Sequence, residues 1–296
     1  YEPVMSDTRG WAATGTFHKS RLWLGFVGER PQTILASKVG DFFNLDVGEG
    51  LDDEGIDITL DDDRVNRVRN FFPGRTLHIF TSGGEWSVRS NINEVITPGN
   101  ISGQLNKETL HGASDVRPQS VDGVTVFIEE DGAIIRQFLF NEVEQSFNAR
   151  NISITSQHLF NNPRAMDIRR ATERQPADYL YVVNDNGTAA VLNRMREQDL
   201  LAWSQFTTNG EFEDVAVSGR KAYFLVKRNI DGTDVRHLEM LNPDHFMDAS
   251  ILQTSGSATT SWSGLDHLNG ETVSVRGDDF ILDDETVSSG SITTSE

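Results

Sequence analysis

The chain has 296 residues, no cysteine and a formal net charge of −19. The lack of cysteine excludes disulfide scaffolds, thiol chemistry and cysteine-ligated zinc or iron–sulfur sites. The negative charge argues against nucleic-acid binding through basic patches, because an acidic surface repels phosphates. No apolar run approaches the ~18 residues of a membrane-spanning helix.

The two ends of the chain suggest that it is a fragment. It begins at Tyr1 rather than at Met, and it stops at Glu296, just after a predicted strand at Ser291–Thr294. We therefore expect the chain to be part of a longer protein.

A repeated pair of strands dominates the sequence. An apolar strand appears five times, at Leu22–Leu24, Leu77–Phe80, Val124–Ile128, Tyr179–Val183 and Ala222–Val226. A polar turn follows each one. The first turn is Gly28–Pro31, and the other four carry glycine close to the return strand (Gly83-Gly84, Asp131-Gly132, Asn186-Gly187, Asp231-Gly232), which favours tight hairpins. The return strands are predicted at Gln32–Ala36, Glu85–Val88, Ala133–Phe138, Thr188–Leu192 and Thr233–Leu241.

The spacing of these hairpins indicates an all-β fold of propeller-like blades, partial or complete. Successive apolar strands begin about 43 to 55 residues apart, and a further strand precedes some of the hairpins, as at Val65–Phe72, Ala165–Ala171 and Phe212–Val217. Units of ~40–50 residues with three or four strands are typical of propeller blades. A series of ordinary hairpins in a β-sandwich is the alternative. Helical periodicity is scarce, and its best candidate, Asn193–Leu201, is short enough to be a turn instead.

The last part of the chain departs from the repeat. Residues Thr254–Gly264 are rich in Ser, Thr and Gly and predict a linker. Short strands at Thr272–Val275, Phe280–Leu282 and Val287–Thr294 predict part of a small β-barrel-like module. We therefore predict a propeller-like domain at 1–253, followed at 254–296 by the linker and the start of the small module.

Motifs for catalysis are missing from the sequence. There is no Gly-rich phosphate loop, G-x-S-x-G elbow or H-E-x-x-H helix, and the seven histidines have no metal-ligand spacing. We predict no enzyme, no catalytic residue and no cofactor. A glycan hydrolase, which would need two positioned carboxylates, is the least favoured alternative.

One acidic segment stands out. Residues 46–63 hold nine carboxylates: Asp46, Glu49, Asp52, Asp53, Glu54, Asp57, Asp61, Asp62 and Asp63. Calcium binds through several oxygen ligands, which makes Asp52, Asp53, Glu54, Asp61, Asp62 and Asp63 candidate ligands. The spacing is not that of an EF-hand, and a solvated acidic loop is the alternative. A smaller acidic cluster lies at Asp278–Glu285.

A long N-terminal block resembles a family of phage proteins. It comprises Gly10–Ala12, Thr16–Gly25, Arg30–Ile34 and Ser37–Leu45, and Thr81–Trp86, Ile96–Pro98, Trp203–Gln205, Thr207–Gly210 and Glu213–Val217 are similar to later parts of the same family. These are large tail proteins of short-tailed phages (podoviruses), called tail tubular protein B, tail nozzle or DNA-stabilisation protein. Residues 264–293 resemble a small β module (FCCH-type) that ubiquitin-activating enzymes also contain.

The resemblance implies a passive structural role in the virion. It implies a homo-oligomeric ring, usually a hexamer, that is assembled in the host cytoplasm beneath the portal and adaptor proteins and serves as the conduit for DNA ejection. Like charge on the wall would let DNA pass without tight binding. We therefore expect the nine carboxylates of residues 46–63, or other acidic loops, to face the lumen. A receptor- or glycan-binding propeller of a tail fibre is the alternative, and exposed tryptophans would favour it.

Overall fold

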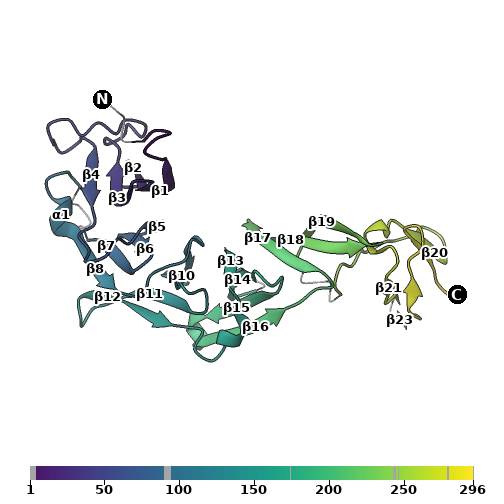
Figure 1. The fold of residues 1–296 in the computed structure, drawn as a ribbon. Helices are drawn as coiled ribbons and strands as arrows, with labels where there is room; N and C mark the ends of the chain where they lie inside the picture. Colours follow the sequence, from purple (N-terminus) through teal and green to yellow (C-terminus); the bar gives the residue numbers. More distant parts are fainter. Residues whose placement is uncertain are drawn as a thin grey trace.

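The computed structural model describes residues 5–89, 95–173, 175–242, 245, 247–278 and 280–295. The regular secondary structure of the described part is almost entirely β-strand, with one short α-helix. Five antiparallel sheets follow one another along an open arc, and a group of two-stranded sheets lies at the far end (Figure 1). We refer to the five sheets as blades 1 to 5.

Blades 1 to 4 have four strands each, paired in chain order. Blade 1 consists of β1 (Ala12–His18), β2 (Arg21–Val27), β3 (Arg30–Ala36) and β4 (Ile56–Thr59). Blade 2 consists of β5 (Val68–Pro73), β6 (Leu77–Thr81), β7 (Gly84–Val88) and β8 (Leu105–Thr109). Blade 3 consists of β9 (Gln119–Val121), β10 (Val124–Ile128), β11 (Ile135–Asn141) and β12 (Ser146–Asn151).

The remaining blades complete the arc. Blade 4 consists of β13 (Pro163–Arg169), β14 (Asp178–Asn184), β15 (Ala189–Met195) and β16 (Leu200–Phe206). Blade 5 has three strands, β17 (Glu211–Ser218), β18 (Lys221–Ile230) and β19 (Thr233–Met240). First strands of successive blades contact one another on the concave side, as β1 contacts β5 and β13 contacts β17, whereas β4, β8, β12 and β16 lie on the convex side (Figure 1).

The prediction of an all-β, propeller-like fold is confirmed. The five predicted apolar strands are β2, β6, β10, β14 and β18, the second strand of each blade. The predicted return strands are the third strands, β3, β7, β11, β15 and β19. The sheets stack side by side around a concave centre instead of forming two facing layers, so the sandwich alternative is wrong.

The stacking depends on second strands that are apolar on both faces. Alternate residues of a strand point to opposite faces of its sheet. In β14, Leu180 and Val182 join the apolar cluster shared with blade 3, while Tyr181 and Val183 join the cluster shared with blade 5. All four are at most 2% exposed. Each such interface therefore removes a full row of apolar side chains from water.

Blades 1 and 2 approach each other closely at Gly25. A Cβ atom at this position in β2 would lie 2.7 Å from Val68 Cγ1 and 2.9 Å from the Phe71 ring. Any larger residue would have to push β5 away, so glycine sets the spacing between these two sheets. Trp23, 0% exposed, fills the same interface two residues earlier.

An aromatic cluster joins blades 2 and 3. Phe80 packs on Phe127 and on Phe138, and Phe138 stacks on Phe147, with ring centroids 4.9 to 5.8 Å apart. The His78 ring lies within this cluster, 5.0 Å from Phe138, and its Nδ1 is 3.1 Å from Thr125 Oγ1. A polar ring is thus enclosed by apolar neighbours.

Two helical features differ from the predictions. The candidate helix at Asn193–Leu201 is wrong, because Asn193–Met195 continue β15 and Arg196–Gln198 form a 3₁₀ turn (η2) before β16. The alternative of a turn holds for residues 196–199 alone, since the two ends of the segment belong to β15 and β16. The α-helix α1 (Ile101–Gln104) was not predicted, and two further 3₁₀ turns, η1 (Gln157–Leu159) and η3 (Asp266–Leu268), lie in connections.

The small sheets at the end form a separate module around Leu265, Val287 and Ile292. They pair β20 (Ser261–Ser263) with β25 (Ser291–Thr293), β21 (Thr272–Val273) with β24 (Glu285–Thr286), and β22 (Arg276–Gly277) with β23 (Phe280–Ile281). The predicted linker is too long, since β20 occupies Ser261–Ser263. The predicted division at 253/254 falls in the connection between β19 and β20.

We predict that stability falls as the pH drops below 6.5. Burial lowers the pKa of His78 to about 4, and the neighbouring His18 adds to the shift. Between about pH 6.5 and pH 4, the His78 side chain is protonated in the unfolded chain but stays neutral in the folded chain. The folded state is therefore favoured above this pH range and loses stability within it. Because of His78, the free energy of unfolding of the protein should fall by roughly 2 kcal/mol as the pH is lowered from 7 to 5.

Urea unfolding at the two pH values measures this loss. The variant His78→Gln should show a pH dependence smaller by that amount, and His158→Gln, which changes an exposed histidine, should behave as the wild type. An equal pH dependence in all three proteins would contradict the assignment.

Candidate functional site: the acidic segment of the first blade

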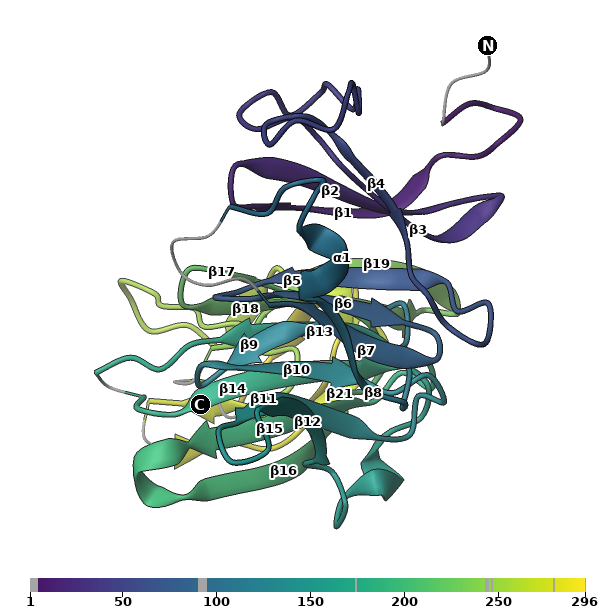
Figure 2. The same cartoon turned by 90° about the vertical axis from the view of Figure 1, so that its left-hand side faces the viewer.

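The acidic segment lies on the convex side of blade 1. Residues 46–63 comprise the end of the β3–β4 connection, strand β4 and the start of the connection to β5. β4 is the outermost strand of its blade, and the β3–β4 connection projects beyond the sheet (Figure 2). We call residues 37–55 the acidic loop.

A buried arginine organises the acidic loop. Arg21, at the start of β2, is 0% exposed. Its Nη1 donates to the carbonyl oxygens of Ser37 (2.6 Å) and Glu54 (2.5 Å), and its Nη2 donates to that of Asp52 (2.7 Å). Burial lowers the pKa of Arg21, and Asp53 partly offsets this effect. The guanidinium group thus fixes both ends of the loop through backbone acceptors.

Glu54 holds the tip of the acidic loop. Its Oε2 accepts hydrogen bonds from the backbone N–H groups of Gly50 (2.7 Å) and Leu51 (2.9 Å). These bonds lower the pKa of Glu54. Glycine suits position 48, because its φ is +50° and a Cβ atom, 1.8 Å from Glu54 Oε1, would displace the Glu54 carboxylate from these bonds. Glu54 is therefore part of the loop's own structure.

Lys38 and Arg30 pair with two further carboxylates. Lys38 Nζ lies 3.3 Å from Asp46 Oδ2, and Arg30 forms a two-pronged ion pair with Asp57 at 2.7 and 2.9 Å. Both pairs are partly exposed, so solvent weakens them. They hold the segment against β3 without neutralising it.

Among the predicted carboxylates, Asp62 has the clearest structural role. Its side chain is 3% exposed, and it accepts from Lys107 Nζ (2.7 Å) of β8 and from Asn66 Nδ2 (2.9 Å). Burial alone would raise its pKa, but these donors outweigh burial and lower the pKa of Asp62 to about 2. Asp62 therefore connects blade 1 to blade 2.

The other predicted carboxylates point to solvent. Glu49, Asp52, Asp53, Asp61 and Asp63 are exposed, while Glu54 and Asp62 are not. In the part of the chain that the structure describes, no three His, Asp or Glu side chains are grouped as a metal site requires. The six calcium candidates are thus not brought together, and Glu54 and Asp62 already have other partners. The prediction that the segment faces a lumen stays a prediction.

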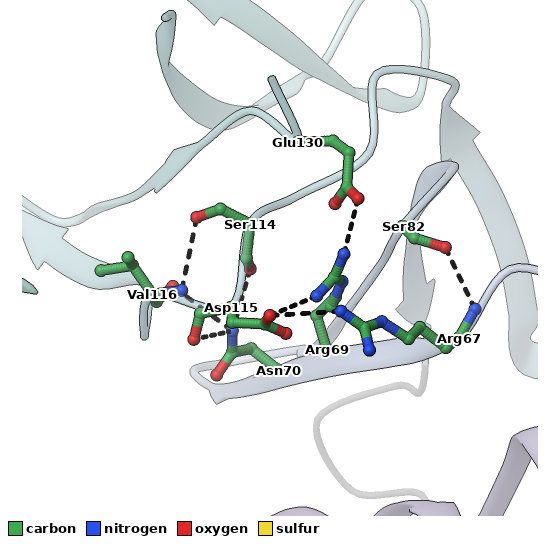
Figure 3. Close-up of polar contacts among 8 residues, drawn as sticks. All are labelled: Arg67, Arg69, Asn70, Ser82, Ser114, Asp115, Val116 and Glu130. Carbon is green, nitrogen blue, oxygen red and sulfur yellow. Dashed lines mark hydrogen bonds and ion pairs between the residues drawn. The ribbon is translucent and has the colours of Figure 1, made fainter. Parts of the chain in front are cut away.

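A second polar cluster, which the sequence did not suggest, joins blades 2 and 3 (Figure 3). Arg69 of β5 pairs with Asp115 and with Glu130 (2.5 Å), and Arg67 reaches the same Asp115 at 3.2 Å. Asn70 Nδ2 lies 3.2 to 3.3 Å from the carbonyl oxygens of residues 114–116. Both arginines are engaged, so the cluster fastens one blade to the next.

Tryptophan positions bear on the glycan-binding alternative. Trp23 and Trp86 are 0% and 5% exposed and belong to the core between blades 1 and 2. Trp203 is half-buried, and its Nε1 donates to the Ile152 carbonyl oxygen at 2.9 Å. Trp11, by contrast, is 63% exposed.

Comparisons with known proteins give no functional assignment. No protein family and no curated protein matches the chain. Among solved structures it is similar to BBS1N in complex with ARL6DN. The mercury-soaked crystal gives a TM-score of 0.40 at 11% identity, covering 70% of this chain and 58% of that chain. The lead-soaked crystal gives 0.42 at 11% identity, covering 76% and 61%.

This chain therefore spans less than two thirds of the BBS1N chains that it matches. The assignment of blades rests on the strand pairing described above and not on these structures. Within the described residues, no helix has the length and apolar character needed to cross a membrane.

We predict that Arg21→Met destabilises the protein by roughly 3 kcal/mol or more, because three backbone carbonyl oxygens lose a charged donor that is itself fully buried. Limited proteolysis should then cut within the acidic loop. The matched control is Arg30→Met, which removes a partly exposed ion pair and should cost at most about 1 kcal/mol. Chemical unfolding measures both values, and equal losses would contradict the role of Arg21.

Proposed function

We propose that this chain is a passive structural component of a phage tail, in the nozzle or hub below the portal. In that role it forms part of the conduit through which DNA is ejected and helps to retain packaged DNA. The proposal assigns it no catalytic step and no cofactor. It also places the protein in the virion, after assembly in the host cytoplasm.

The observation that carries this proposal is the charge of the surface. The chain has a formal net charge of −19, and several of its cations, including Arg69, Arg228 and Lys107, are committed to carboxylates within the fold. Five carboxylates of the acidic segment are exposed and lie outside the core: Glu49, Asp52, Asp53, Asp61 and Asp63. A wall of this kind repels DNA along its whole length.

The proposed assembly is a homo-oligomeric ring, sixfold by resemblance to the phage family, in contact with portal, adaptor and other tail proteins. A sixfold ring would multiply the charge of one chain by six. The exposed carboxylates of residues 46–63 are the proposed lumen-facing groups. DNA would then slide past without forming the counterion-releasing contacts that give stable binding.

Trp11 favours a second candidate, a receptor- or glycan-binding propeller of a tail fibre. Its ring is exposed, and its Nε1 donates to Asp7 Oδ1 at 3.2 Å, which holds the side chain in place. Exposed aromatic rings can stack on sugars. Saturable binding to host cells that is lost in Trp11→Ala would favour this candidate over the conduit.

We predict that the protein does not bind DNA even at low ionic strength. Fluorescence anisotropy of labelled double-stranded and single-stranded DNA should show no saturable change. A variant with Asp52, Asp53, Asp61 and Asp63 each replaced by Lys should bind, and added salt should abolish that binding. Saturable binding by the wild-type protein would contradict the proposal.

A further inference from the structure

The hairpin β22–β23 projects from the small module with both faces uncovered. Neighbouring residues on a strand point to opposite faces, and Phe280 is 73% and Ile281 87% exposed. In contrast, the module buries Leu265, Val287 and Ile292 around its own centre. Two large apolar side chains on opposite faces of one hairpin suit insertion between other side chains better than contact with a flat surface.

The module presents this hairpin away from the blades. β20 and β25 pair side by side, and Thr294 N donates to the Thr260 carbonyl oxygen at 2.8 Å, so the first and last described strands of the module lie together. One described polar contact between the module and blade 5 joins Asn269 Nδ2 to Asp231 Oδ2 at 3.0 Å. The hairpin lies at the opposite end of the module from β20 (Figure 1).

An apolar hollow lies on the hairpin of β11 and β12 in blade 3. It has a volume of about 540 Å³, and Leu139, Phe140 and Val143 line it together with Arg150. Val143 is 93% and Leu139 44% exposed. This hollow therefore leaves apolar side chains in water that a partner could cover.

The hollow offers one cation, Arg150, to the acidic residues beside the hairpin. Exposed Asp278, Asp283 and Asp284 flank the projecting hairpin. Arg150 at the hollow is exposed, and no residue that the structure describes forms an ion pair with it. Glu142 also borders the hollow, so the attraction depends on Arg150 lying nearer to the incoming carboxylates.

We propose that the β22–β23 hairpin of one copy docks on the blade 3 hollow of a second copy, with Ile281 in the hollow and Arg150 against the aspartates of the hairpin. One chain cannot make this contact with itself, because the module and blade 3 lie far apart along the arc (Figure 1). The contact is heterologous, so repeating it produces a ring where the rotation closes and a filament where it does not.

This inference rests on the proposed ring, for which it names the interface. Sedimentation velocity over a range of protein concentrations tests it. Wild-type protein should assemble, and Ile281→Asp and Val143→Asp should each raise the dissociation constant at least about tenfold, the effect of losing a central apolar contact. Leu110→Asp alters an equally exposed apolar residue elsewhere (74%) and should assemble as the wild type does.

Exchanging the charges of the two surfaces distinguishes this contact from nonspecific association. Arg150→Asp should weaken assembly, and combining it with Asp283→Arg and Asp284→Arg should restore it. Thermal melts that match the wild type confirm that each variant folds. Wild-type-like assembly of both Ile281→Asp and Val143→Asp would overturn this interface and leave the proposed ring standing. A wild-type protein that stays monomeric at every concentration would overturn the ring as well.

Discussion

The packing of one sheet on the next is the constraint on which the structure depends. The second strand β14 of blade 4 buries Leu180 toward blade 3 and Tyr181 toward blade 5, so this inner blade is covered by a neighbour on each face. In β18 the same alternation leaves Phe224 buried against blade 4 while Tyr223 and Leu225 on the opposite face are half-buried.

The second and third strands could be predicted from the sequence because they are apolar runs separated by Gly-containing turns. The fourth strands could not be located: β8 (Leu105–Thr109) is half-buried and mostly polar, and its position depends on pairing with β7. The helical alternative at Asn193–Leu201 failed for a related reason. Its first residues pair with β14 and β16, and the ladder outweighs local helix propensity.

The acidic segment was visible in the sequence, but the roles of its residues were not. Arg21 binds the backbone of Asp52 and Glu54, and composition says nothing about carbonyl groups. Asp62 takes its partner Lys107 from 45 residues further along the chain. The ion pairs of Arg69 with Asp115 and Glu130 likewise form only when two blades meet. The sequence identified the charged residues. Only the tertiary contacts show which of them have a structural role and which are exposed.

Electron cryo-microscopy of the assembled protein with DNA tests the passive-conduit proposal most directly. The account predicts a ring of copies whose channel carries exposed carboxylates of residues 46–63, with DNA density along the axis and separated from the protein wall. A particle in which DNA is held against the protein, or in which a bound metal or sugar occupies a cleft of convergent carboxylates, would contradict it.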